Sequence, residues 1–186
     1  MTRNTLGEAE YYLKTHEGKT LPKRGHFIIF NFSKFDDPKG IGLTDREGSE
    51  IDVKKLKECF EGHLGFKVKV KQDFLRKEVK EKLKKLKEYD FSKHQMFGMA
   101  IMTHGDEGGI LHTYKATEHM ILNEYVDAIK QNKTLAGKPK VIVLSGDLLM
   151  FWKVTLLVYG PWSKPKAFLN PIFLNRFYKP ISTSLL

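Results

Sequence analysis

The sequence predicts an α/β fold in which helices lie on both faces of a largely parallel central sheet. Short apolar runs typical of strands alternate along the chain with segments that carry apolar residues every three or four positions. In addition, His104 directly follows one of these runs, and open α/β sheets form their sites beyond the carboxyl ends of strands. We therefore expect a layered domain with a site at that edge of the sheet.

Four segments have the composition of strands: residues 26–32, 66–70, 97–103 and 141–144. The last two are apolar runs that predict buried strands. Residues 66–70 instead alternate apolar and basic side chains, which predicts a strand with one solvated side.

Three further segments show helical periodicity. The first carries apolar side chains on one face over residues 53–60, and Ser49 is the expected cap at its amino terminus. The second spans residues 74–86, with Asp73 as its expected cap, and the third spans residues 120–129.

The formal net charge of +10 suggests, as one alternative, a basic module that binds nucleic acid or an acidic membrane surface. However, the lysines of residues 80–88 are interleaved with glutamates, a pattern typical of a solvated helix face. No aromatic residues interrupt that run to stack on bases. Specific binding of nucleic acid is therefore not expected.

Cys59 is the only cysteine, so a disulfide within the chain is impossible, which favours a cytoplasmic protein. Its place on the apolar face of the first helix predicts an unreactive core thiol. No apolar run approaches the ~20 residues of a membrane-spanning helix, so no membrane span is expected. The histidines and carboxylates lack metal-site spacing and no phosphate-binding loop is present, so neither a metal nor a cofactor is expected.

Three motifs follow one another along the chain. They are Thr-x-Arg-x-Gly-Ser-x-x-Asp at residues 44–52, Thr-His-Gly-x-Glu-Gly at residues 103–108, and Gly-Lys-Pro-Lys at residues 137–140. In this order they resemble the large subunit of caspases, the cysteine endopeptidases that cleave after aspartate. The resemblance covers residues 24–147 and implies a caspase-like layered fold, truncated because no small subunit can be recognised.

The resemblance also implies roles for individual residues. Arg46 matches the arginine that binds the carboxylate of the substrate aspartate, for which the paired N–H donors of a guanidinium are suited. His104 matches the catalytic histidine, and Gly105 matches the residue whose N–H contributes to the oxyanion hole. At the position of Thr44, the family offers a backbone carbonyl to the histidine.

The segment after the last predicted strand departs from the family pattern. Caspases continue there into Gln-Ala-Cys-Arg-Gly, but this chain continues into Ser145-Gly146-Asp147-Leu148-Leu149. Ser145 thus replaces a glutamine of the substrate pocket, and Asp147 stands at the position of the nucleophilic cysteine. Because a carboxylate would not give a productive acyl-enzyme, we predict that this chain is catalytically inactive.

The sequence divides into a short N-terminal arm (1–23), the caspase-like domain (24–147) and a tail (148–186). The tail contains no Asp or Glu, is rich in large apolar residues, and resembles no caspase small subunit. Its run 152–159 could either pair with the sheet as a surrogate edge strand or expose apolar surface.

Two main hypotheses remain open. The chain is either an inactive regulator or decoy that pairs with an active caspase, or with another apoptosis protein, or it is a truncated or mis-spliced product of an active caspase gene. In the second hypothesis the tail replaces the nucleophile segment.

Overall fold

The computed structural model describes residues 23–145, 155–159 and 166–168 of the chain. Its helices are α2 (Ser49–Lys57), α3 (Arg76–Glu88) and α4 (Leu122–Lys130), with short helical turns η1 (Glu58–His63), η2 (Glu107–Gly109) and η3 (Lys133–Leu135). The strands of the main sheet are β1 (Lys23–Asn31), β2 (Lys67–Gln72), β3 (His94–Met102), β7 (Lys140–Ser145), β8 (Thr155–Tyr159) and β9 (Lys166–Phe168). A small second sheet contains β4 (Gly105–Asp106), β5 (Ile110–His112) and β6 (His119–Ile121).

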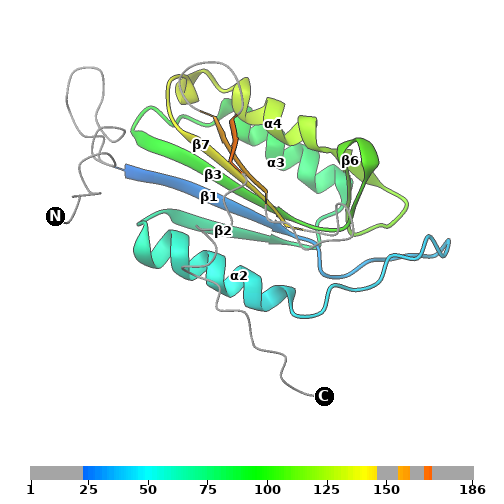
Figure 1. Cartoon of the computed structure of the whole chain (residues 1–186). Helices are drawn as coiled ribbons and strands as arrows, with labels where there is room; N and C mark the ends of the chain where they lie inside the picture. Colours follow the sequence, from blue (N-terminus) through cyan, green and yellow to red (C-terminus); the bar gives the residue numbers. More distant parts are fainter. Residues whose placement is uncertain (1–22, 146–154, 160–165, 169–186) are drawn as a thin grey trace.

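The main sheet has six strands in the order β2-β1-β3-β7-β8-β9. The first four are parallel, and β8 and β9 are antiparallel to their neighbours. Helices α3 and α4 lie on one face of the sheet and α2 lies on the other (Figure 1). The predicted α/β fold, with a largely parallel sheet between helices, is confirmed. Residues 155–159 of the run 152–159 do pair with β7, as β8, but they do not form the edge: among the described strands, β9 pairs with the other side of β8 and lies at the edge.

The central strand β1 supplies side chains to the cores on both faces. Ile28 and Phe30 join the apolar cluster under α3 and α4, whereas Phe27 and Ile29 pack with side chains of α2 and η1. All four are at most 1% exposed. Burying such a side chain stabilises the fold by roughly 1.5–3 kcal/mol, so β1 anchors both layers.

The prediction that Ser49 caps α2 is wrong. Ser49 is the first residue of the helix, and Gly48, in the left-handed region at φ 78°, takes the capping position. The hydroxyl of Ser49 is buried and accepts a hydrogen bond from Asn31 Nδ2 at 3.2 Å. A side chain held by the sheet in this way cannot also cap the helix.

The prediction that Asp73 caps α3 is also wrong. Helix α3 begins three residues later, with Leu75 as the capping residue, and the N–H of Leu75 donates to Glu78 Oε2 at 2.8 Å. The carboxylate of Asp73 instead accepts hydrogen bonds from the chain that leaves β1.

Two expectations about the other helices need smaller corrections. The third helix begins at Leu122 and not at Met120, because Met120 pairs with Leu111 in the small sheet. Cys59 is half-buried and lies outside the buried core, in η1. Burial still raises the pKa of its thiol, which disfavours the reactive thiolate.

The Gly-Lys-Pro-Lys motif fixes the start of β7. Lys140 is buried, and its ammonium donates to the carbonyl oxygens of Leu135 at 2.8 Å and Lys138 at 2.7 Å. Lys138 in turn donates to the carbonyl oxygens of Phe91 at 2.6 Å and Ser92 at 2.9 Å, just before β3. The two lysines therefore tie the entry of β7 to that of β3.

We expect the substitution Tyr125→Phe to raise the free energy of unfolding by about 1 kcal/mol, because a buried hydroxyl without a partner costs stability. Tyr125 is 0% exposed, and its hydroxyl has no hydrogen-bond partner among the described residues. Urea unfolding monitored by circular dichroism measures the change. Tyr125→Leu is the control: it also loses the ring contact with Phe30, whose centroid lies 5.5 Å away, so it should destabilise. A less stable Tyr125→Phe would show that the hydroxyl is satisfied in solution.

His26, on β1, makes stability depend on pH. Burial lowers its pKa to about 4, with further contributions from His94 and from lysines of β2 and α3. Below about pH 6.5, His26 therefore binds a proton in the unfolded chain but not in the folded chain. The free energy of unfolding is highest above that pH and decreases as the pH falls towards 4.

The full pKa shift of His26 would correspond to a loss of roughly 3 kcal/mol in the free energy of unfolding. Because the His26 ring is partly exposed, we expect a smaller loss of about 1–2 kcal/mol. Urea unfolding at pH 7.5 and pH 5 should show a smaller difference between the two pH values for His26→Phe than for the unchanged chain. Equal differences would contradict the assignment to His26.

Candidate functional site

Four neighbouring strands of the sheet end side by side. In the strand register, Gln72 of β2 lies beside Asn31 of β1, Asn31 beside Met102 of β3, and Met102 beside Ser145 of β7. The N–H of Thr103 donates to the carbonyl oxygen of Ser145 at 3.0 Å, which continues the pairing past the end of β3. The segments that carry the sequence-predicted site residues therefore leave the sheet from one edge.

His104 follows this edge and is held in one orientation. Its Nε2 lies 2.7 Å from the carbonyl oxygen of Thr44, and the ring of Phe35 packs against it with centroids 4.9 Å apart. A carbonyl oxygen only accepts hydrogen bonds, so Nε2 carries the proton. In the neutral ring Nδ1 is then the basic nitrogen, the one able to take a proton from a reacting group. The contact with Thr44 is the one that the family resemblance implies.

Arg46 lies two residues after Thr44 and is anchored by backbone and side chain. Its N–H donates to the carbonyl oxygen of Ser33 at 2.8 Å. Its guanidinium Nη1 donates to the carbonyl oxygen of Phe32 at 3.2 Å and to Asn31 Oδ1 at 3.4 Å. Because Arg46 and Thr44 share one loop, the loop positions a cation and the carbonyl that orients His104 together.

Asn31 links Arg46 to the sheet, and sequence reasoning missed it. It is 1% exposed, and its Nδ2 donates to Gln72 Oε1 at 3.0 Å and to Ser49 Oγ at 3.2 Å. A buried amide is costly unless its donors and its acceptor are satisfied, and here both kinds of atom have partners. One feature of the sequence could have pointed to Asn31: two strands each end in a polar residue, β1 in Asn31 and β2 in Gln72.

Asp73 anchors the beginning of the same loop. Its Oδ1 accepts from the backbone N–H of Ser33 at 2.6 Å and of Lys34 at 3.0 Å, and its Oδ2 accepts from Gln72 Nε2 at 2.9 Å. Asp73 adopts φ 49°, in the left-handed region that aspartate tolerates better than most residues. The loop is therefore fixed at both of its ends, near Ser33 and near Arg46.

The turn after His104 is held by a second set of contacts. Gly105 pairs with Leu111 in the small sheet, and the N–H of His112 donates to the carbonyl oxygen of His104 at 3.0 Å. His112 is buried, and its Nε2 lies 2.7 Å from Asp106 Oδ2. The structure thus brings Arg46, His104, Gly105 and Ser145 to one edge of the sheet, and Asp147 lies outside the described residues.

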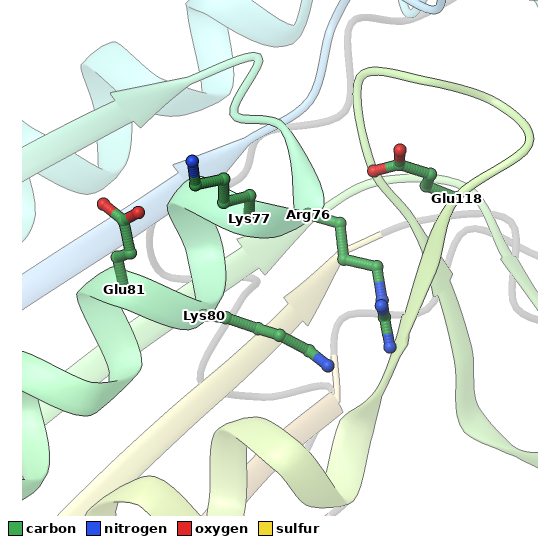
Figure 2. Close-up of a pocket in the computed structure, with 5 residues that line it drawn as sticks. All are labelled: Arg76, Lys77, Lys80, Glu81 and Glu118. Carbon is green, nitrogen blue, oxygen red and sulfur yellow. The ribbon is translucent and has the colours of Figure 1, made fainter.

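A cavity of about 420 Å³ lies apart from these residues, between the first turns of α3 and the turn that precedes β6 (Figure 2). Its lining is charged: Arg76, Lys77, Lys80, Glu81 and Glu118. Arg76 Nε donates to the carbonyl oxygen of His119 at 2.9 Å. None of the predicted site residues lines it, so we do not assign the site there.

Across the part of the chain that the structure describes, no three His, Cys, Asp or Glu side chains are grouped so as to hold a metal ion. Among the helices of that part, none combines the length and the apolar character that crossing a membrane requires.

Comparisons with known proteins show which family this chain resembles. The family described as "Caspase domain" matches residues 24–145. Caspase-3 of Mesocricetus auratus is 34% identical over 133 residues, which are 72% of this chain and 47% of that protein. Caspase-1 of Drosophila melanogaster is 34% identical over 131 residues, which are 68% of this chain and 38% of that protein. The solved structure of pro-sf-caspase-1 superposes with a TM-score of 0.61 at 29% identity, covering 68% of this chain and 52% of that one. The chain therefore spans about half the length, or less, of these relatives.

Proposed function

This chain belongs to the caspase family, and on that premise we propose that it is a member that binds Asp-containing peptide segments without cleaving them and regulates an active caspase. The observation that carries the proposal is Asp147, which stands where the family has its nucleophilic cysteine. The contacts around His104 and Arg46 support a retained peptide site. The expected partner is an active caspase, or another apoptosis protein, in the cytoplasm.

The proposed chemistry follows from the groups that remain. Arg46 supplies a guanidinium that suits the carboxylate of an aspartate side chain. The N–H of Gly105 would donate to the peptide carbonyl oxygen, as in an oxyanion hole. His104 can move a proton through Nδ1, but bond cleavage also needs a nucleophile that forms a productive acyl intermediate. Such a site holds a peptide and leaves it intact.

The first test asks whether the purified chain cleaves a fluorogenic tetrapeptide that ends in aspartate. We expect no cleavage above the level of a His104→Ala variant. Cleavage that His104→Ala abolishes would contradict the proposed inactivity.

The second test measures binding of a fluorescein-labelled Asp peptide by fluorescence anisotropy. Arg46→Ala should weaken binding about 10-fold or more, since a charge-assisted pair contributes roughly 1.5–3 kcal/mol. Arg76→Ala is the matched control, because Arg76 lines the charged cavity on α3, which none of the predicted site residues lines. A peptide with Asn in place of Asp should bind as weakly as the Asp peptide binds to Arg46→Ala. Equal binding of the Asp and Asn peptides would contradict the role of Arg46.

The second candidate function belongs to the gene and not to this polypeptide: the chain would be a truncated or mis-spliced product of an active caspase gene. The observation that favours it is the change of composition at residues 148–186, directly after the caspase-like segment 24–147. Sequencing the messenger RNA across the codons for residues 138–162 tests it. A message that splices into a Gln-Ala-Cys motif supports this candidate, and a message that reads through Asp147 excludes it.

A further inference from the structure

Strand β2 forms one end of the main sheet. It pairs with β1, and among the described residues no other strand lies on its far side. Figure 1 shows β2 at the lower border of the sheet. Within that part of the chain, the backbone N–H and C=O groups on its outer side have no strand to pair with. Such an edge is a template for the addition of another strand.

The edge strand carries a lysine at every second position. Lys67, Lys69 and Lys71 pair in the register with His26, Ile28 and Phe30 of β1. Neighbours in a parallel sheet point to the same face, and two of these β1 residues belong to the apolar cluster under α3. The three lysines therefore share the α3 face of the sheet, and successive lysines are about 6.6 Å apart along the strand.

Helix α3 brings two more lysines to the same place. Burial lowers the pKa of Lys82, and the charges of Lys69, Lys71 and Lys85 lower it further, which places these ammonium groups near one another. No described carboxylate lies within ion-pair distance of any of the five lysines. Glu78, one helical turn before Lys82, uses its carboxylate to cap the start of the helix. We call these lysines the β2 lysine stripe: Lys67, Lys69, Lys71, Lys82 and Lys85.

Lysines on an edge strand usually discourage pairing with other strands, since a neutral or basic strand cannot offset their charge. A strand with acidic side chains would instead be attracted by the lysines. A peptide in extended conformation presents alternate side chains to one face at the same spacing as the lysines, so carboxylates at every second position would each meet an ammonium group.

We propose that the edge of β2 and the β2 lysine stripe form a docking surface for an extended acidic peptide of a partner protein, which adds to the sheet as a further strand. The unpaired edge selects a polypeptide over a nucleic acid or a lipid surface, because only a polypeptide backbone can continue the strand pairing. The tail of this chain, residues 148–186, contains no Asp or Glu and therefore lacks the charge of the occupant. This surface runs along the outer side of β2 and meets the site edge only at the last residue of the strand, Gln72.

The test uses the full chain and a fluorescein-labelled peptide of alternating Glu and Val residues. The triple variant Lys67→Gln, Lys69→Gln and Lys71→Gln should weaken binding about 10-fold, as the loss of three surface charge pairs predicts. The matched control, Lys77→Gln, Lys84→Gln and Lys87→Gln, removes the same charge from exposed positions of α3. It should change the affinity less than about 2-fold, because screening limits action at a distance. Equal losses for the two triple variants would overturn the proposal.

Two further ligands, both tested with the unmodified chain, separate strand addition from general attraction of negative charge. A peptide of the same charge, N-methylated at alternate residues on its pairing edge, should bind at least about 10-fold more weakly, because it cannot form the strand ladder. A single-stranded oligothymidylate of equal charge should also bind more weakly. If either of them binds as tightly as the unmethylated peptide, the surface recognises charge alone and the proposal fails. Slower hydrogen exchange in residues 67–72 upon peptide binding would support it.

Discussion

Replacing Gly98 with alanine is expected to lower the free energy of unfolding by about 3 kcal/mol, at the upper end of the usual cost of overpacking. A Cβ atom at this position in β3 would lie 2.3 Å from Cδ2 and 2.8 Å from Cε2 of Phe27. Phe27 is 0% exposed, and its ring stacks on that of Phe60 with centroids 3.6 Å apart. The ring has no space into which it can move, so the sheet and the α2 layer would separate locally. Urea unfolding measures the change.

Gly62→Ala is the control for this prediction. A Cβ atom there would meet no described atom within 4 Å, and the residue lies in η1, so alanine should be neutral or stabilise by up to about 1 kcal/mol. Combining Gly98→Ala with Phe27→Leu should recover part of the loss, because the smaller side chain relieves the clash. Additive losses in the double variant would show that the clash with Phe27 is not the cause.

The substitution Asn31→Asp is expected to weaken the binding of an Asp-containing peptide about 10-fold or more and to lower stability by about 2 kcal/mol. The new carboxylate would lie where Asn31 Oδ1 now accepts from Arg46, and its charge would compete with the peptide for the guanidinium. Its second oxygen cannot donate to Gln72 or Ser49 as the amide does, which explains the loss of stability. Anisotropy with the labelled peptide and urea unfolding measure the two effects.

Asp45→Asn provides the matched comparison, because it alters a charge in the same loop as Arg46 without touching Asn31. The ion pair between Asp45 and Lys34 is 2.8 Å long, but both side chains are exposed, so its loss should leave the stability almost unchanged. An Asn31→Asp variant that keeps the affinity of the unchanged chain would contradict the coupling to Arg46.

The sequence predicted the four parallel strands of the main sheet, and the central ones were recognisable because each buries a long run of side chains. The strand 97–103 illustrates this, since β3 is buried along almost its whole length. The small sheet could not be predicted. Its strands contain only two or three residues each, too few for an alternation of apolar and polar positions to appear.

The candidate site was predictable only in part, for a related reason. Arg46 and His104 lie in motifs with a specific local spacing, so they can be found without knowing what they contact. Asn31, Gln72 and Asp73 act through partners up to 41 residues away, and no local pattern marks such pairs. Asp73 and Ser49 were both predicted as helix caps because local preference suggested it, and tertiary hydrogen bonds overrode that preference in each case.

The carbonyl of Thr44 carries a constraint that substitution experiments would not detect. Every amino acid has a backbone carbonyl, so a complete mutational scan should score position 44 as tolerant, although it sets the tautomer of His104. The constraint lies in the length of the loop between its anchors at Ser33 and Arg46. Deleting one residue there would displace the chain by up to ~3.8 Å, which is too far for the hydrogen bond between Thr44 and His104 to persist. Among related chains, the number of residues in this loop should therefore vary less than their identity.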